Sequence, residues 1–365
     1  MTATYRADHV GSLLRPRAVM EGRQAHGNGE ISAEKLRHIE DAAILEALEG
    51  QRKAGLQIFT DGELRRGSWI TDMAEAVDGF VRQSRTIEWH GPQAGREAST
   101  SQVVGGKLRA RRRLTENQSA FLKQHAPGAC KMTVPAPSNF YIVGYAPGVT
   151  DAAYSSRDEL MVDVVGIVRR EVEGLIAEGF EYIQMDSPFY GAFIDEHERQ
   201  RLREAGLDPD EGLEKVVAAD NAALQGLGRA GLTLGLHICR GNSRSRWLYE
   251  GGYDHIAEKL FGGLDVDAFL LEYDSPREGT FEPLRFVPKG KTVVLGLVNT
   301  KEPKLESPDE LGRRIDEAAR YVPLEQLTLS PQCGFASVAA GNLISEDDQW
   351  RKLELVVETA QRVWG

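Results

Sequence analysis

The residues most able to do chemistry stand in a short apolar segment, where a histidine and a cysteine are separated by one residue. Leu234 begins a run that reaches Ile238 and contains His237, and Cys239 follows directly. The run predicts a buried strand. Side chains two apart on a strand share a face, so His237 and Cys239 point the same way. An imidazole beside a thiol is half of a zinc site, whereas a core histidine next to an inert cysteine is the alternative.

Seven other segments have the composition of strands, and most alternate with segments of helical spacing. This alternation, without a composition break, predicts an α/β protein: a single (β/α)8 TIM barrel over residues 1–365. Residues 82–114 lack helical periodicity and are interpreted as an insertion between strands two and three that could form a hairpin. A doubly wound sheet is the alternative, but no glycine-rich phosphate loop follows strand one. The expected strands cover residues 6–12, 57–60, 130–134, 182–185, 234–239, 268–271, 292–298 and 327–329.

Serine residues mark the starts of several expected helices. Ser32 can cap a helix, and Ser345 can cap the last one. Ser156 and Ser307 are each followed three residues later by a glutamate, which predicts capping boxes. A further helix is expected over residues 210–229.

The polar side chains that follow the expected strands share one location, because chemistry in such a barrel sits at the carboxyl ends of the strands. Glu272 ends strand six, next to the strand of His237, and Cys333 comes shortly after strand eight. Two thiolates, an imidazole and a carboxylate that a substrate could displace suit Zn²⁺. Cys130 begins strand three, at the opposite face, and is interpreted as a small core hydrophobe. The strand-end side chains are Ser12, Glu63, Asp186, His237, Cys239, Glu272, Lys301 and Cys333.

Composition narrows the class of protein. The 365 residues are 41% hydrophobic and 27% charged, as expected for a globular chain with a large core. A net charge of −11 argues against nucleic acid or an anionic membrane as a partner. Three cysteines cannot form a disulfide framework, and residues 1–6 lack the apolar core of a signal peptide. We therefore expect a cytoplasmic protein.

Seven motifs in the same order resemble the C-terminal catalytic barrel of cobalamin-independent methionine synthase, most closely its short single-barrel relatives. The resemblance covers nearly the whole chain. The motifs are R-A-D-H-V-G-S-L-L-R-P (6–16), T-D-G-E-L-R-R (60–66), I-Q-M-D-S-P (183–188), H-I-C-R-G-N (237–242), L-E-Y-D (271–274), G-L-V-N-T-K-E-P-K-L-E-S (296–307) and S-P-Q-C-G-F (330–335).

The resemblance implies roles for the strand-end residues. His237, Cys239 and Cys333 match the family's zinc ligands, and Glu272 matches its weaker carboxylate ligand. A bound zinc ion would keep a substrate thiol deprotonated and reactive.

Three further residues match positions that hold the amino-acid part of homocysteine: Ser12, Glu63 and Asp186. An ammonium group needs nearby carboxylates, which the two acids supply. Three departures from the family pattern limit what the resemblance implies, and the third concerns the methyl donor. The N-terminal barrel of the long synthase is not found in this sequence. Ser187 replaces one acid, and residues 299–303 (N-T-K-E-P) replace the family's histidine-containing loop.

The resemblance implies methyl transfer to the thiol of homocysteine, forming methionine, with a methyltetrahydrofolate or methylcorrinoid donor. Lys301 or His9 could protonate the leaving group. The expected partners are a small-molecule thiol and a methyl donor, without nucleic acid or membrane. Two alternatives stay open: zinc-dependent alkylation of another thiol, for example by epoxide opening, and a zinc-binding protein without turnover. The sequence does not determine the oligomeric state.

Overall fold

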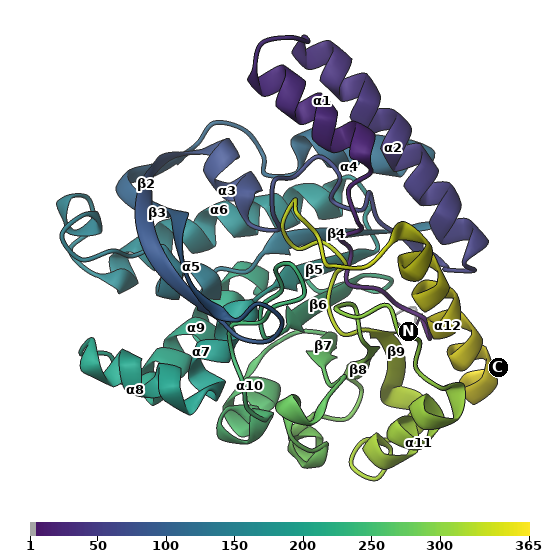
Figure 1. Cartoon of the computed structure of the whole chain (residues 1–365). Helices are drawn as coiled ribbons and strands as arrows, with labels where there is room; N and C mark the ends of the chain where they lie inside the picture. Colours follow the sequence, from purple (N-terminus) through teal and green to yellow (C-terminus); the bar gives the residue numbers. More distant parts are fainter. Residues whose placement is uncertain (1–4) are drawn as a thin grey trace.

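A curled, fully parallel sheet forms the centre of the molecule, which we describe from a computed structural model for residues 5–365 (Figure 1). Residues 1–4, within the stretch searched for a signal peptide, lie outside the described part. The sheet has seven strands in the order β1-β4-β5-β6-β7-β8-β9. Neighbours follow chain order, so the reversal that defines a doubly wound sheet does not occur. The strands are β1 (Ile58–Phe59), β4 (Ala129–Pro135), β5 (Tyr182–Asp186), β6 (Thr233–Ile238), β7 (Ala268–Glu272), β8 (Thr292–Val298) and β9 (Leu327–Pro331).

The segment expected as the first strand, residues 6–12, is not a regular strand. It forms one isolated parallel bridge, between Ala7 and Leu329 of β9. Side chains of the inner strands replace the ladder: Gln184 donates to the carbonyl of Val10 over 2.8 Å, and Lys131 donates to that of His9. These side-chain bonds provide partners for the carbonyl groups of Val10 and His9 in place of a neighbouring strand. The expectation of eight regular strands was wrong at this segment.

Helices pack around the outside of the sheet (Figure 1). Helices and loops cover the faces of the sheet, so strands such as β6 are buried along their whole length. The helices are α1 (Arg17–Gly27), α2 (Ala33–Lys53), α3 (Thr71–Ala76), α4 (Glu116–His125), α5 (Ser138–Val143), α6 (Arg157–Ala177), α7 (Gly191–Ile194), α8 (Glu196–Glu204), α9 (Pro209–Leu224), α10 (Ala257–Gly263), α11 (Pro308–Ala318) and α12 (Glu346–Trp364). Among the described residues, no helix has the length and apolar character needed to cross a membrane.

The helix starts follow the expected serines, although not every capping bond forms. Ser32 and Ser156 accept bonds from the third residue of their helices, and Ser345 forms a complete capping box. The box expected at Ser156 is only half formed, because the carboxylate of Glu159 accepts from Ser155 instead. Ser307 precedes α11 without a side-chain capping bond, so the box expected there was wrong. A proline at the first position already begins that helix in a helical conformation.

An antiparallel hairpin stands apart from the central sheet. It consists of β2 (Val77–Trp89) and β3 (Gly95–Ala110), within the stretch between β1 and β4. In Figure 1 it is the long curved blue ribbon to the left of the central strands. Its turn is tied to the loop after β6 by an antiparallel bridge between His90 and Trp247. The hairpin expected over residues 82–114 therefore begins and ends a few residues earlier.

Candidate metal and thiol-binding site

Three potential metal donors meet at the carboxyl end of the sheet. His237 lies near the end of β6, Cys239 follows that strand, and Cys333 follows β9. One donor atom from each residue lies within 4.8 Å of the others, and all three side chains are buried. The parallel register makes this possible, because neighbouring strands deliver their final residues to the same edge.

The imidazole of His237 is oriented by a carboxylate. Its Nδ1 lies 3.1 Å from Oδ1 of Asp186, the residue paired with it in β5. Its other nitrogen, Nε2, is buried and has no hydrogen-bond partner among the described residues. A histidine held by a carboxylate on one nitrogen and free on the other is the usual arrangement of a metal ligand. The residues present therefore fit a zinc ion.

The three cysteines differ in environment: the neighbouring Cys333 and burial raise the pKa of the Cys239 thiol. The neighbouring thiol of Cys239 and the imidazole of His237 lower the pKa of the Cys333 thiol, which favours the thiolate that a metal needs. Cys130 lies in β4 and is buried, and burial raises the pKa of its thiol to about 11. It lies away from the donors, as an inert core residue would.

A cavity of about 90 Å³ adjoins the three donors. The three residues expected to hold an amino acid, Ser12, Glu63 and Asp186, line its wall together with them. Trp69, Trp89 and Phe189 contribute aromatic surface. Segments that are far apart in the sequence therefore place acids, thiols and aromatic rings around a single cavity.

Glu63 is held in an unusual backbone conformation with one free oxygen. Its φ is 56°, in the left-handed region that non-glycine residues seldom adopt, and such strain is concentrated at functional sites. Oε1 accepts a bond from Thr133 over 2.8 Å and lies 3.7 Å from Arg66. Oε2 has no partner among the described residues. Burial raises the pKa of this carboxyl group to about 7.

Ser12 and Asp186 are fixed by close neighbours. A Cβ atom at Gly334 would lie 1.9 Å from Oγ of Ser12, so only glycine allows the approach of this loop. Oδ1 of Asp186 accepts a bond from Gln184 over 2.7 Å in addition to its contact with His237. Asp186 therefore orients the metal donor as well as lining the cavity, a role that the sequence pattern did not indicate.

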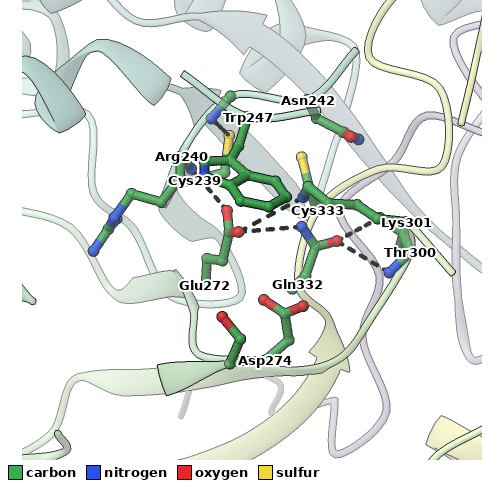
Figure 2. A network of polar contacts seen from close by, with 12 residues as sticks. Cys239, Arg240, Asn242, Trp247, Glu272, Asp274, Thr300, Lys301, Gln332 and Cys333 are labelled. Carbon is green, nitrogen blue, oxygen red and sulfur yellow. Dashed lines mark hydrogen bonds and ion pairs between the residues drawn. The ribbon is translucent and has the colours of Figure 1, made fainter. Parts of the chain in front are cut away.

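Glu272 lies beside the donors but is engaged elsewhere (Figure 2). Oε2 accepts the backbone N–H of Arg240 over 2.7 Å. Oε1 accepts bonds from Arg277 over 2.8 Å and Gln332 over 3.3 Å, and lies 3.6 Å from Nζ of Lys301. Burial opposes ionisation of Glu272, yet these cations lower its pKa to about 2. The carboxylate does not belong to the group of donors within 4.8 Å of one another.

The two expected proton donors do not lie on the cavity wall. Lys301 faces Glu272. His9 is buried, and its Nε2 lies 3.2 Å from the carbonyl oxygen of Ile58 in β1. Burial and the ammonium of Lys131 lower the pKa of His9 to about 4, so its imidazole is neutral at pH 7.

Trp89, Arg246 and Arg277 are parts of the site that sequence reasoning missed. Trp89 lines the cavity from the hairpin, and the guanidinium of Arg246 lies 4.7 Å from its ring centroid. Arg277 follows β7 and carries the bond to Glu272. The motif at residues 271–274 pointed to this loop, but nothing in it indicated an arginine directed back toward the strand end.

A parallel sheet that brings thiols, an imidazole and carboxylates to one cavity defines an α/β protein with a donor set that could hold a metal ion. The chain belongs to the family described as cobalamin-independent synthase, catalytic domain, whose profile matches residues 5–361. It is 39% identical to the uncharacterized protein YxjH of Bacillus subtilis over 99% of this chain and 95% of that protein. It is 25% identical to the methionine synthase of Saccharolobus solfataricus, over 96% and 92%.

Solved structures agree with this membership. A candidate vitamin B12-independent methionine synthase from Listeria monocytogenes has a TM-score of 0.75 and 30% identity, covering 100% of this chain and 99% of that one. A B12-independent methionine synthase from Shewanella, solved with selenomethionine, has the same TM-score at 20% identity, covering 99% and 98%. The family resemblance seen in the motifs is confirmed.

Proposed function

We propose that the protein is a zinc-dependent methyltransferase that moves a methyl group to the thiol of homocysteine. The observation that carries the proposal is the shared cavity, which the three donors line together with Ser12, Glu63 and Asp186. Family membership supports methyl transfer as the reaction. The donor set supports zinc, since two thiolates with an imidazole are preferred by that ion.

We propose His237, Cys239 and Cys333 as the metal ligands, with Glu272 as a fourth that the substrate displaces. Zinc at this point would lower the pKa of an incoming thiol, so that the thiolate forms at neutral pH. Asp186 fixes the imidazole through Nδ1, which leaves Nε2 for the metal.

The amino-acid end of the substrate is assigned to Glu63 and Ser12, which line the same cavity as the donors. The free Oε2 of Glu63 is a buried acceptor without a partner, and an α-ammonium group would supply one. Ser12 offers a hydroxyl to the α-carboxylate. The aromatic side chains of Trp69, Trp89 and Phe189 limit access of water to the thiol.

Two residues are candidates for protonating the leaving group, Lys301 and His9. Of the two candidates, His9 is neutral at pH 7, which disfavours it as an acid. Lys301 carries a proton, but its Nζ faces Glu272. A methyl donor of the folate or corrinoid kind remains compatible with either.

We further propose a closed barrel for the whole chain. Residues 6–8 contact β9 by backbone bonds, which supports a closed eight-fold barrel in which they take the place of a strand. We treat residues 1–365 as one catalytic unit acting in the cytoplasm on small molecules.

Methionine formation tests the proposal directly. Zinc-loaded protein is incubated without oxygen with L-homocysteine and, separately, methyltetrahydrofolate or methylcobalamin, and the products are read by mass spectrometry. We expect methionine with one donor and none after removal of zinc by a chelator. Methylation of simple thiols in preference to homocysteine would support alkyl transfer to another thiol instead.

A further inference from the structure

The carboxylate of Glu272 lies in a cradle of cations and amide donors that accounts for both of its oxygens. We define this cradle as the side chains of Arg277, Lys301 and Gln332 with the backbone N–H of Arg240. Figure 2 labels Arg240, Lys301 and Gln332 around Glu272. Glu272 is completely buried, and a buried carboxylate is costly unless charges and hydrogen bonds compensate it. The cradle supplies that compensation without a metal ion.

The cationic members of the cradle differ in how they are held. Arg277 also forms an ion pair with Glu278 over 2.7 Å and lies 3.4 Å from Asp274, and its guanidinium is 4.3 Å from the ring centroid of Trp247. Lys301 is buried, and its Nζ has no hydrogen-bond partner among the described residues. Its nearest carboxylate is Glu272, at 3.6 Å. A buried ammonium group without a hydrogen bond requires an explanation, because its desolvation is uncompensated.

The backbone around Lys301 is fixed independently of its ammonium group. Its N–H donates to Asn299 over 2.6 Å, and its carbonyl accepts from Ser245 over 2.7 Å. The loop after β8 therefore does not need the charge of Lys301 in order to keep its shape. The ammonium is placed beside a carboxylate that our proposed function assigns to the metal.

We infer that Lys301 and Arg277 are positioning residues that compete with the metal for Glu272 and hold its carboxylate when the substrate thiol takes its place. This inference rests on the proposed function. Without the cradle, release of Glu272 would leave an unpaired buried charge and would oppose thiol binding. With it, the released carboxylate has the partners seen in this structure.

Lys301→Met tests the inference, since methionine keeps much of the side-chain volume and removes the charge. Homocysteine affinity is measured without a methyl donor on cobalt-substituted protein, whose absorption reports sulfur ligation. Zinc affinity is measured by chelator competition. We expect about tenfold weaker homocysteine binding, the equivalent of one charge-assisted contact, with zinc binding unchanged or tighter. A general loosening of the site would weaken zinc binding instead.

A second background separates the carboxylate from other effects of the charge. In Glu272→Gln protein the cradle has no carboxylate to hold, so adding Lys301→Met should change homocysteine affinity by less than about twofold. Lys291→Met, at the opposite end of β8, is the matched control and should resemble wild type. Arg277→Lys, which keeps the charge but not the paired donors, should weaken homocysteine binding severalfold only where Glu272 is intact.

The outcomes distinguish the inference from the function on which it rests. Equal losses from Lys301→Met in the wild-type and Glu272→Gln backgrounds, with zinc retained, would overturn the inference alone. Weaker zinc binding in Lys301→Met would do the same. A wild-type protein that binds no zinc would overturn the proposed function and this inference together.

Discussion

At the scale of single residues, the site depends on cysteines that share a chemical type but not an environment. Cys239 and Cys333 lie with His237 around one point, whereas Cys130 lies within β4 as part of the core. Neighbouring donors lower the pKa of Cys333, and burial raises that of Cys130. Of these two environments, only that of Cys333 suits a thiolate ligand.

Replacing either donor thiol should remove the metal. Cys239→Ser or Cys333→Ser deletes one of the few ligands, so we expect little bound zinc by metal analysis. Cys130→Ser is the control and should retain it. In wild type, the pKa of about 11 keeps Cys130 protonated at pH 8, and iodoacetamide should leave it unmodified. Full zinc in both donor variants would contradict the ligand assignment.

Glu63 should make the preference for homocysteine depend on pH. A carboxyl group with a pKa of about 7 is neutral at pH 6 and ionised at pH 8, and only the ionised form attracts an ammonium group. The affinity for homocysteine relative to 2-mercaptoethanol should therefore rise between pH 6 and 8. The simple thiol corrects for proton release at the metal, which both thiols share.

Glu63→Gln should remove this pH dependence and reduce the preference for homocysteine by roughly 10- to 100-fold. Zinc content should stay at the wild-type level, because Glu63 contacts none of the donors. An equal loss for both thiols would mean that Glu63 acts on the fold of the site and not on the amino group.

At the scale of elements, the β2–β3 hairpin contributes Trp89 to the wall of a cavity that is otherwise built from strand ends and the loops after them. Arg246, after β6, pairs with Glu97 of β3 through both guanidinium nitrogens, at 2.9 and 3.1 Å. The same arginine lies over Trp89, which lines the cavity. One side chain thus connects the central sheet, the hairpin and the cavity wall.

Glu97→Gln should weaken the attachment of the hairpin to Arg246 with little effect on global stability. The pair is partly exposed, so its loss should cost at most about 1 kcal/mol of unfolding free energy. We expect kcat/KM to fall severalfold, with normal zinc content and faster hydrogen exchange in residues 77–110. Glu88→Gln is the matched control, because Glu88 pairs with Arg96 inside the hairpin. Equal kinetic effects of both substitutions would contradict a tethering role for Glu97.

At the scale of the whole molecule, the chain segment before α1 is joined to the sheet interior by a buried ion pair. Nζ of Lys131 in β4 lies 2.6 Å from Oδ1 of Asp8, and Tyr182 in β5 donates to Oδ2 over 3.0 Å. The lysine and Asp8 are both buried. This contact links the irregular segment to strands that follow it far along the sequence.

Lys131→Met should destabilise the protein strongly. It leaves the Asp8 carboxylate buried without a cation, which costs about 3–5 kcal/mol of unfolding free energy. Lys215→Met removes an exposed pair with Asp158 and should cost about 1 kcal/mol or less. Urea unfolding of both variants gives the comparison. Similar, small shifts of both midpoints would show that the interior pair does not hold the segment in place.

The sequence by itself determined the central strands and the donor residues. Apolar runs with defined lengths predicted β4 to β9 closely, because a strand buried on both faces has a local signature. Parallel strands end at one edge, so His237, Cys239 and Cys333 could be brought together from their positions alone. The motifs added the family, which the whole-chain match confirmed.

Only the tertiary structure decided which hydrogen bonds and ion pairs the polar side chains form. The sequence predicted a regular strand at residues 6–12, but bonds from Lys131 and Gln184 replace the ladder there. It placed Glu272 beside the metal donors, but Arg277 and Lys301 hold its carboxylate in this structure. Such contacts join loops and strands that are distant in the chain. Their distances follow from register, loop path and packing, none of which leaves a periodic pattern in the local sequence.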